Sequence, residues 1–152
     1  LEQLLRSLVE SNEITPEVAA KVPVTQAYEF FQSTFGQWIV QNSHALVREQ
    51  AFSYVLEANE FFKSIQTDDL MMIHGIIDGY IELDDEIVVF DYKTDYVVDY
   101  TEGIQSIVRK YKDQLNIYAD ALSISCNKKV TRKVLCLLSI NKNIDIDTLK
   151  AI

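Results

Sequence analysis

The sequence predicts an α/β fold in which one β-sheet is flanked by helices and preceded by a helical segment. Three observations support this class. The 152 residues suffice for about one domain, and 48% of them are hydrophobic, which is enough for one core. Apolar residues recur at helical spacing up to residue 44 and at strand spacing from about Ala45. The resulting order, α-α-β-β-β-α-β, is typical of a sheet with helices on its faces, in an α/β or α+β arrangement.

Residues 1–44 are predicted to be a helical lead-in packed on the core. Leucine and valine repeat at helical spacing through the start of the chain, and Thr15 is a helix N-cap residue followed by Pro16 at the first helical position. A further helix is expected to begin at Val24 and to be interrupted at Gly36, after which the apolar spacing resumes.

The rest of the chain, residues 45–152, is expected to form a single core domain. Its expected elements are, in order, strands over 46–56, 70–81 and 87–93, a helix over 102–125 and a strand over 128–140. The acidic segment between the second and third strands, residues 82–86, is interpreted as a solvated hairpin turn whose carboxylates are not ligands.

Composition excludes several classes of protein. The chain has 14 basic and 23 acidic residues, a formal net charge of −9, whereas a free-standing nucleic-acid-binding domain would carry a basic face. A nuclease that uses divalent cations is not excluded. No apolar run approaches the ~20 residues of a membrane-spanning helix, and no signal peptide opens the chain. Cys126 and Cys136 are expected to be buried thiols in a reducing compartment. Because the first residue is Leu1 rather than Met, we expect a fragment of a longer chain.

Three polar side chains in the second and third expected strands are candidates for catalysis. Asp78 lies within an apolar run and Asp91 ends another, where a carboxylate is costly to bury unless it is paired or binds a metal ion. If the strands form a hairpin, the two carboxylates meet at the same end of the sheet. Lys93, two residues after Asp91, projects from the same face of its strand. Two carboxylates and an ammonium there suit Mg²⁺, and the lysine would orient or activate the attacking water in phosphodiester hydrolysis.

These residues also have structural interpretations. An Asp at a strand end is commonly a turn former, and Lys93 can simply mark the exit from the sheet. Gln114 and Tyr118 are four apart on the expected helix and share one face, from which an amide and a hydroxyl could bind a phosphate or the attacking water. Taken alone, they would be a surface glutamine and a core tyrosine.

Two segments carry a resemblance to a known family. GIIDGYIELDDEIVVFDYKTD (75–95) and YKDQLNIYADAL (111–122) contain G-x-x-D, D-Y-K-T-D and Q-x-x-x-Y in that order. They resemble the motifs of the RecB-like branch of the PD-(D/E)XK nuclease superfamily, in particular the C-terminal nuclease domains of the AddA or RexA family of bacterial helicase–nucleases. The upstream segments ITPEVAAKV, AYEFFQSTFGQWI and VREQAF are similar to the lead-in of those domains, so that the resemblance covers nearly the whole chain. It implies a restriction-endonuclease-like core with a mixed sheet.

The resemblance also implies roles for single residues. Asp78 and Asp91 would be ligands of Mg²⁺, or of Mn²⁺, with the backbone carbonyl of Tyr92 as a further ligand. Lys93 would be the catalytic lysine beside the two aspartates. No iron–sulfur cluster is expected, because the cysteines that bind it in some relatives are absent.

The other matching positions are expected to support this site. Gln114 and Tyr118 would belong to its supporting and DNA-facing part, and Glu49, in an Arg-Glu pair, is expected to be structural rather than catalytic. The family usually has a histidine ligand in an early helix, and neither His44 nor His74 stands in such a helix. We expect that helix to precede Leu1, which would leave this fragment without one metal ligand and with weak or no activity of its own.

The implied function is that of a Mg²⁺-dependent DNA exonuclease domain in a helicase–nuclease complex, which processes double-strand breaks for recombinational repair. An ATP-binding helicase portion of the same polypeptide and a second subunit of the AddB or RexB type would feed single-stranded DNA to it, in the bacterial cytoplasm at the nucleoid and without a membrane partner. Their surfaces would supply the phosphate contacts that this acidic domain lacks. One alternative is a catalytically incomplete module that guides DNA or assembles subunits. Another is a CRISPR-type or phage exonuclease that acts alone.

Overall fold

The computed structural model describes residues 1–61, 67–97 and 102–152. The helices are α1 (Glu2–Glu10), α2 (Pro16–Ala19), α3 (Val24–Gln32), α4 (Thr34–Gln41), α5 (Ala58–Phe61) and α6 (Glu102–Cys126), with 3₁₀ turns η1 (Ser43–Ala45) and η2 (Leu138–Ile140). The strands are β1 (Leu46–Glu57), β2 (Leu70–Glu82), β3 (Glu86–Lys93), β4 (Lys129–Leu137), β5 (Lys142–Asp145) and β6 (Lys150–Ala151).

The strands form one mixed sheet in the order β1-β2-β3-β4-β5-β6. Neighbouring strands are antiparallel except for β3 and β4, which are parallel. A parallel pair needs a crossover connection, and the long helix α6 provides it. This arrangement confirms the predicted α/β class with a single mixed sheet.

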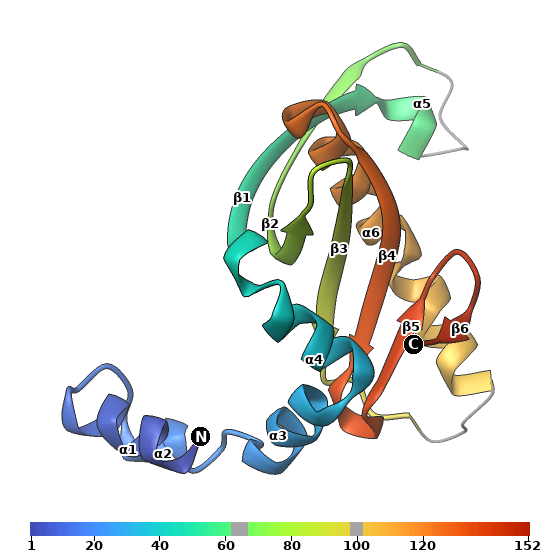
Figure 1. Cartoon of the computed structure of the whole chain (residues 1–152). Helices are drawn as coiled ribbons and strands as arrows, with labels where there is room; N and C mark the ends of the chain where they lie inside the picture. The colour runs from blue at the N-terminus through green and yellow to red at the C-terminus, as the bar shows by residue number, and fades with distance from the viewer. Residues whose placement is uncertain (62–66, 98–101) are drawn as a thin grey trace.

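Helices cover both faces of the sheet (Figure 1). The apolar side of α6 packs on one face and the α3–α4 pair packs on the other. Because alternate residues of β3 point to opposite faces, this strand contributes to both cores. In the first core, α6 residues Leu115 and Leu122 pack with Ile87, Val89, Leu135 and Ile144. In the second, Phe30, Phe35 and Ile39 pack with Val88, Phe90, Val134 and Cys136.

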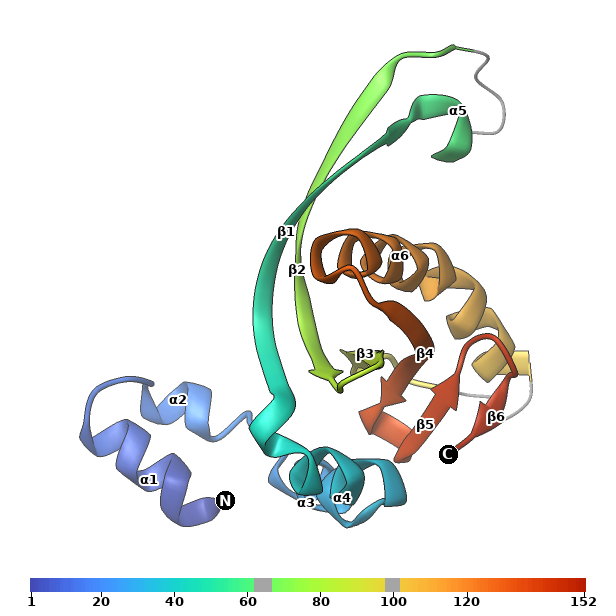
Figure 2. The ribbon, with the colours of Figure 1, turned by 45° about the horizontal axis from the view of Figure 1, so that its top comes forward.

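The helical lead-in divides into two parts. In α1 and α2 no residue is buried, and Figure 2 shows both helices standing away from the sheet. In contrast, α3 and α4 carry the second core. In the described part of the chain, no helix is both long and apolar enough to cross a membrane.

The expected interruption at Gly36 is wrong, because the chain turns at Ser33 instead. Ser33 has an extended backbone, and its hydroxyl accepts a hydrogen bond from the Gly36 N–H at 3.0 Å, which caps the start of α4. Gly36 lies in the first turn of α4, where a Cβ would be 2.0 Å from the carbonyl oxygen of Phe30. The glycine therefore permits the close approach of α3 and α4 rather than ending a helix.

The pairing of β1 with β2 is irregular beside Asp78 of β2. On β1, Val47 and Phe52 pack against the same core although they are five residues apart, so the strict alternation of sides is broken between them. Glu49 lies in this interval and has a left-handed backbone, with φ of 51°. On β2, Ile77 and Tyr80 likewise share that core. The change of side in both strands occurs between the register pairs Arg48–Gly79 and Gln50–Ile77, where Glu49 and Asp78 are the intervening residues.

The C-terminal segment differs from the expected single strand over 128–140. β4 ends at Leu137, and the 3₁₀ turn η2 and left-handed Asn141 then reverse the chain into β5. β5 and β6 were not predicted, because they contain only four and two residues. Both cysteines are free thiols; Cys136 is buried and Cys126 is half-buried.

Candidate active site

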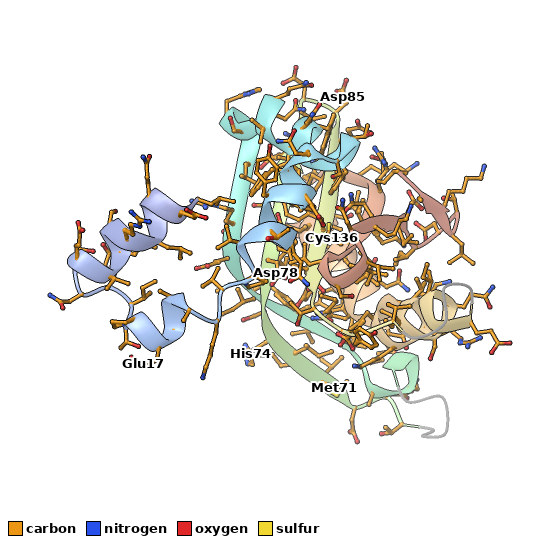
Figure 3. All side chains as sticks on the ribbon, turned by 90° about the horizontal axis from the view of Figure 1, so that it is seen from below. Glu17, Met71, His74, Asp78, Asp85 and Cys136 are labelled. Atoms are coloured by element: carbon orange, nitrogen blue, oxygen red, sulfur yellow. The ribbon has the colours of Figure 1, made fainter. Side chains whose placement is uncertain are left out.

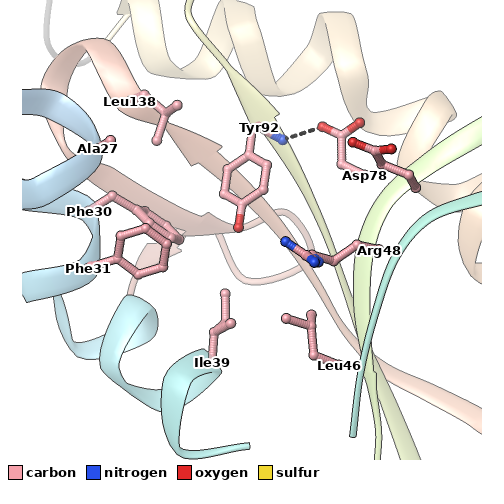
Figure 4. Close-up of a pocket in the computed structure, with 10 residues that line it drawn as sticks. Ala27, Phe30, Phe31, Ile39, Leu46, Arg48, Asp78, Tyr92 and Leu138 are labelled. Atoms are coloured by element: carbon pink, nitrogen blue, oxygen red, sulfur yellow. Dashed lines mark hydrogen bonds between the residues drawn. The ribbon is translucent and has the colours of Figure 1, made fainter. Parts of the chain in front are cut away.

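The β2–β3 hairpin brings Asp78 and Asp91 together. The ladder between the strands ends at the pair Gly79–Phe90, and the two aspartates are the adjacent residues on either strand. Beyond that pair, Oδ2 of Asp78 accepts a hydrogen bond from the backbone N–H of Tyr92 at 2.9 Å (Figure 4). Figure 3 shows Asp78 well away from Asp85 in the hairpin turn. The carboxylates therefore lie at the end of the ladder opposite the turn, as the spacing predicted.

Asp91 is the buried carboxylate of this site. Its side chain is 1% exposed, and Oδ2 accepts no well-aligned hydrogen bond from any described residue. Nζ of Lys93 lies 2.5 Å from this oxygen and forms an ion pair with it. Burial raises the pKa of Asp91, the Lys93 ammonium opposes the rise, and the Asp78 carboxylate adds to it. The site thus holds a carboxylate whose desolvation is only partly compensated by the protein.

Lys93 extends from β3 toward α6. Its Nζ lies 4.3 Å from the centroid of the Tyr111 ring. The hydroxyl of Tyr111 is within 3.0 and 3.2 Å of the two carboxylate oxygens of Asp95, which also pairs with Lys110 at 2.8 Å. The ammonium of Lys93 is therefore held between a carboxylate and an aromatic face.

Gln114 and Tyr118 share one face of α6 and are bonded to each other. The amide of Gln114 donates to the Tyr118 hydroxyl at 2.6 Å, and that hydroxyl donates to the backbone carbonyl of Ile76 at 2.9 Å. Tyr118 is buried and packs edge-on against Phe52, with ring centroids 5.3 Å apart. These bonds join α6 to β2 two residues before Asp78. The geometry makes Tyr118 a support of β2.

A mostly apolar pocket of about 470 Å³ opens beside Asp78 (Figure 4). Tyr92, whose side chain points to the face opposite Asp91, contributes to its wall and packs edge-on against Phe30 at 5.3 Å. Burial raises the pKa of Tyr92, and the nearby guanidinium of Arg48 opposes that rise. The full lining is Ala27, Phe30, Phe31, Ile39, Leu46, Arg48, Glu49, Asp78, Tyr92 and Leu138.

Sequence reasoning missed this pocket. Its lining comes from α3, α4, β1, β2, β3 and η2, so no local pattern marks it. One available signal was the alternation of β3, which sends Tyr92 to the side of α3 while Asp91 and Lys93 face α6. Glu49, expected to be structural, lines the pocket together with Asp78 and carries the left-handed backbone described above.

The two histidines lie elsewhere. His44 is exposed in η1, and His74 is exposed on β2, where its Nδ1 is 2.9 Å from the Ser53 hydroxyl. Among residues 1–61, 67–97 and 102–152, no three His, Cys, Asp or Glu side chains are arranged to hold a metal ion. The site as described is a pair of carboxylates.

The residues present nevertheless fit a hard divalent cation. The Asp78 and Asp91 carboxylates supply oxygen donors, which Mg²⁺ and Mn²⁺ prefer. Oδ2 of Asp91 is buried without a well-aligned hydrogen bond among the described residues, and a cation would satisfy it. Mg²⁺ usually takes only one or two protein carboxylates and keeps several water or phosphate ligands, so a pair of carboxylates suffices.

The chain belongs to the PD-(D/E)XK nuclease superfamily, whose profile matches residues 1–146. The mixed sheet, the hairpin with its paired aspartates and the following helix agree with this membership. The resemblance found from the motifs is thereby confirmed.

The chain is also similar to individual curated proteins. The chain is 38% identical over 146 residues to an ATP-dependent helicase/nuclease subunit from Ligilactobacillus salivarius, an alignment that covers 95% of the chain and 11% of the relative. It is 40% identical over 144 residues to the protein of the same name from Enterococcus faecalis, covering 93% of the chain and 11% of the relative. The protein of that name from Limosilactobacillus fermentum is 44% identical over 125 residues, which are 79% of the chain and 9% of the relative. The chain thus spans about a tenth of the length of these curated relatives.

Proposed function

We propose that this chain is the nuclease domain of a helicase–nuclease and hydrolyses DNA phosphodiester bonds with Mg²⁺ or Mn²⁺. The observation that carries the proposal is the buried Asp91 carboxylate, which has one oxygen without a well-aligned hydrogen bond among the described residues and lies next to Asp78 and Lys93. Buried, imperfectly compensated carboxylates are found where a metal ion or a reaction requires them. Membership of a nuclease superfamily supports the same chemistry.

In this proposal, the Asp78 and Asp91 carboxylates and the Tyr92 backbone carbonyl hold the cation. When bound, the cation polarises the scissile phosphate and lowers the pKa of a coordinated water. Asp78 keeps its orientation through the hydrogen bond from the Tyr92 N–H. Lys93 orients the attacking water and offsets the negative charge that develops on the phosphate. Gln114 and Tyr118 hold β2 in place.

The proposed substrate is single-stranded DNA, cleaved as an exonuclease at a double-strand break that is being prepared for recombinational repair in the bacterial cytoplasm. The relatives' name combines a helicase with a nuclease and describes one part of an assembly, which supports an ATP-driven motor and a second protein chain as partners. The formal net charge of −9 also favours partners, because a domain this acidic gains from phosphate contacts made on other surfaces.

The alternative is a nuclease-fold module without activity that guides DNA or joins subunits. The observation in its favour is that no three His, Cys, Asp or Glu side chains in the described residues form a metal cluster. Such a module would still bind DNA, but the charge of Asp91 would have no catalytic role in it.

The test uses the complete gene product that contains this chain. End-labelled single-stranded DNA is incubated with Mg²⁺ and ATP, and nucleotide release is compared for the wild type, Asp91→Asn, Lys93→Ala and the exposed-turn control Asp84→Asn. We expect the two site variants to lose about 10³-fold or more of the nuclease rate, while the control and the ATPase rate of every variant stay unchanged. Full nuclease activity in Asp91→Asn would refute the proposal. DNA binding without cleavage by the wild type would favour the alternative.

A further inference from the structure

The aromatic ring of Tyr111 is the most direct neighbour of Lys93 that the site motifs leave without a role. The Lys93 side chain is 16% exposed, and among the described residues two groups lie close to its ammonium. One is Oδ2 of Asp91, and the other is the face of Tyr111, whose centroid is 4.3 Å from Nζ. An ammonium within about 6 Å of a tyrosine ring centroid is attracted by the negative face of the ring.

The Tyr111 ring is itself held from its other end. Its hydroxyl contacts both carboxylate oxygens of Asp95, at 3.0 and 3.2 Å, and Lys110 bonds to the same carboxylate at 2.8 Å. The Ser139 hydroxyl donates to the Asp95 backbone carbonyl at 2.6 Å, which ties the segment after β3 to η2. The hydrogen bonds from Lys110 and Tyr111 lower the pKa of Asp95, so that it stays ionised and keeps accepting them. The ring is therefore fixed at a defined place on α6.

The two neighbours of Lys93 are not equivalent for catalysis. Oδ2 of Asp91 is also the oxygen that the proposed function assigns to the cation, so a bound cation and the lysine compete for it. The Tyr111 ring contains no metal donor at the contact with Nζ and keeps its attraction for the ammonium when that oxygen is taken. A lysine side chain has a flexible four-carbon stem and loses rotamer entropy when it is fixed. A rigid ring beside it reduces its freedom before the reaction.

We propose that Tyr111, anchored by Asp95, is a positioning residue that holds the ammonium of Lys93 at the reacting phosphate. This inference rests on the proposed function, because it acts only through Lys93. Tyr111 itself touches neither the substrate nor the cation in this proposal, and its contribution comes from the ring face and not from the hydroxyl as a proton donor.

The experiment compares Tyr111→Leu and Tyr111→Phe in the complete gene product, with kcat and KM measured on single-stranded DNA at saturating Mg²⁺. Tyr111→Leu removes the ring and is expected to lower kcat about 3- to 30-fold, the range of a cation–π interaction, with KM unchanged. Tyr111→Phe keeps the ring but removes the hydroxyl that Asp95 anchors, so it is expected to lower kcat by less than Tyr111→Leu and to about the same level as Asp95→Ala. Mn²⁺ affinity, measured by calorimetric titration, should be the same in all three proteins.

A second series separates positioning from a structural role. Asp95→Ala releases the ring without removing it, and kcat should again fall with KM unchanged; this variant also serves if Tyr111→Leu does not fold. In a Lys93→Ala background, neither change should lower the residual rate further, since effects that act through one residue are not additive. The inference is overturned if the kcat of Tyr111→Leu and Asp95→Ala equals that of the wild type, or if their effects persist without Lys93. If Lys93→Ala alone is fully active, the catalytic role that the proposed function gives to Lys93 is refuted.

Discussion

Oδ2 of Asp78 lies 2.9 Å from the backbone nitrogen of Tyr92 and accepts its hydrogen bond, one step past the last ladder pair of the β2–β3 hairpin. A side chain thus joins β2 to β3 at the end where the backbone ladder stops. The same carboxylate is a proposed metal ligand. Asp78 therefore has a structural and a chemical role that substitutions can separate.

Replacement of Asp78 should separate these roles. Asp78→Asn keeps an oxygen acceptor for the Tyr92 N–H, so we expect it to lower the free energy of unfolding by less than about 1 kcal/mol. Asp78→Ala leaves that N–H unpaired and should cost about 1–3 kcal/mol. Both should lose nuclease activity, because both remove the charge. Urea unfolding followed by fluorescence and a nuclease assay check this, and equal stability of the two variants would contradict the structural role.

Metal ions should stabilise the folded chain through Asp91. A ligand that binds only the native state at about 100 times its dissociation constant adds about 2.7 kcal/mol to the free energy of unfolding. We expect Mn²⁺ to raise the melting temperature of the wild type and of the turn variant Asp84→Asn, whose carboxylate is exposed. Asp91→Asn should show no rise. Differential scanning fluorimetry with and without the ion decides this, and an equal rise in Asp91→Asn would remove Asp91 from the ligand set.

Tyr118→Phe tests the supporting role of the α6 pair. The substitution removes the hydroxyl that joins Gln114 to the Ile76 carbonyl, so the free energy of unfolding should fall by about 1–2 kcal/mol. KM for DNA should not change, because Tyr118 is buried. The matched control is Tyr96→Phe, whose ring is 83% exposed and whose stability should not change. A raised KM without loss of stability would make Tyr118 a DNA contact instead.

Gly36 should not tolerate a side chain. A Cβ there would lie 2.0 Å from the Phe30 carbonyl oxygen, so Gly36→Ala forces α3 and α4 apart. The expected loss in the free energy of unfolding is about 1–3 kcal/mol or more, which is typical of overpacking. Gln37→Ala, at the next and exposed position, should stay within about 0.5 kcal/mol of the wild type. Chemical denaturation of the two variants is the check, and equal stability would mean that the helices can move apart freely.

The Asp95 carboxylate should make stability depend on pH in acid. The hydrogen bond from Lys110, and then that from Tyr111, lower the pKa of Asp95 in the folded chain below its ordinary value of 3.8. The unfolded chain therefore binds more protons in this window, and stability rises with pH there. The contribution is complete above about pH 5 and is lost as the pH falls through the native pKa. The difference in melting temperature between wild type and Asp95→Asn should shrink in the same range, and a constant difference would contradict the lowered pKa.

Local patterns sufficed to predict the α/β class, the hairpin and the meeting of Asp78 with Asp91, because these features depend on residues within one short stretch. The long amphipathic α6 was equally clear. The turn at Ser33 was not predicted. Gly36, three residues later, has the stronger preference for interrupting a helix, whereas Ser33 ends α3 by capping the start of α4. β5 and β6 are too short to show a period, and their pairing depends on β4.

The surroundings of the site depend on contacts that no local pattern records. Lys93 reaches Tyr111 only because α6 crosses over to pack on the face to which β3 directs that lysine. The pocket beside Asp78 exists only once α3 and α4 have packed on the opposite face. A left-handed backbone is uncommon for any residue other than glycine, so the sequence predicts a regular strand at Glu49. The structure has φ of 51° there instead.

The irregularity at Glu49 also bears on how copies of this chain behave toward one another. β1 stands at the edge of the sheet and is 12 residues long, so its outer row of N–H and C=O groups is a template on which a strand from another molecule can pair. A left-handed residue flanked by Arg48 breaks that row near one end, and the charges of both residues oppose a dry contact. The backbone distortion beside the aspartates thereby also shortens the regular stretch of this edge on which another strand could pair.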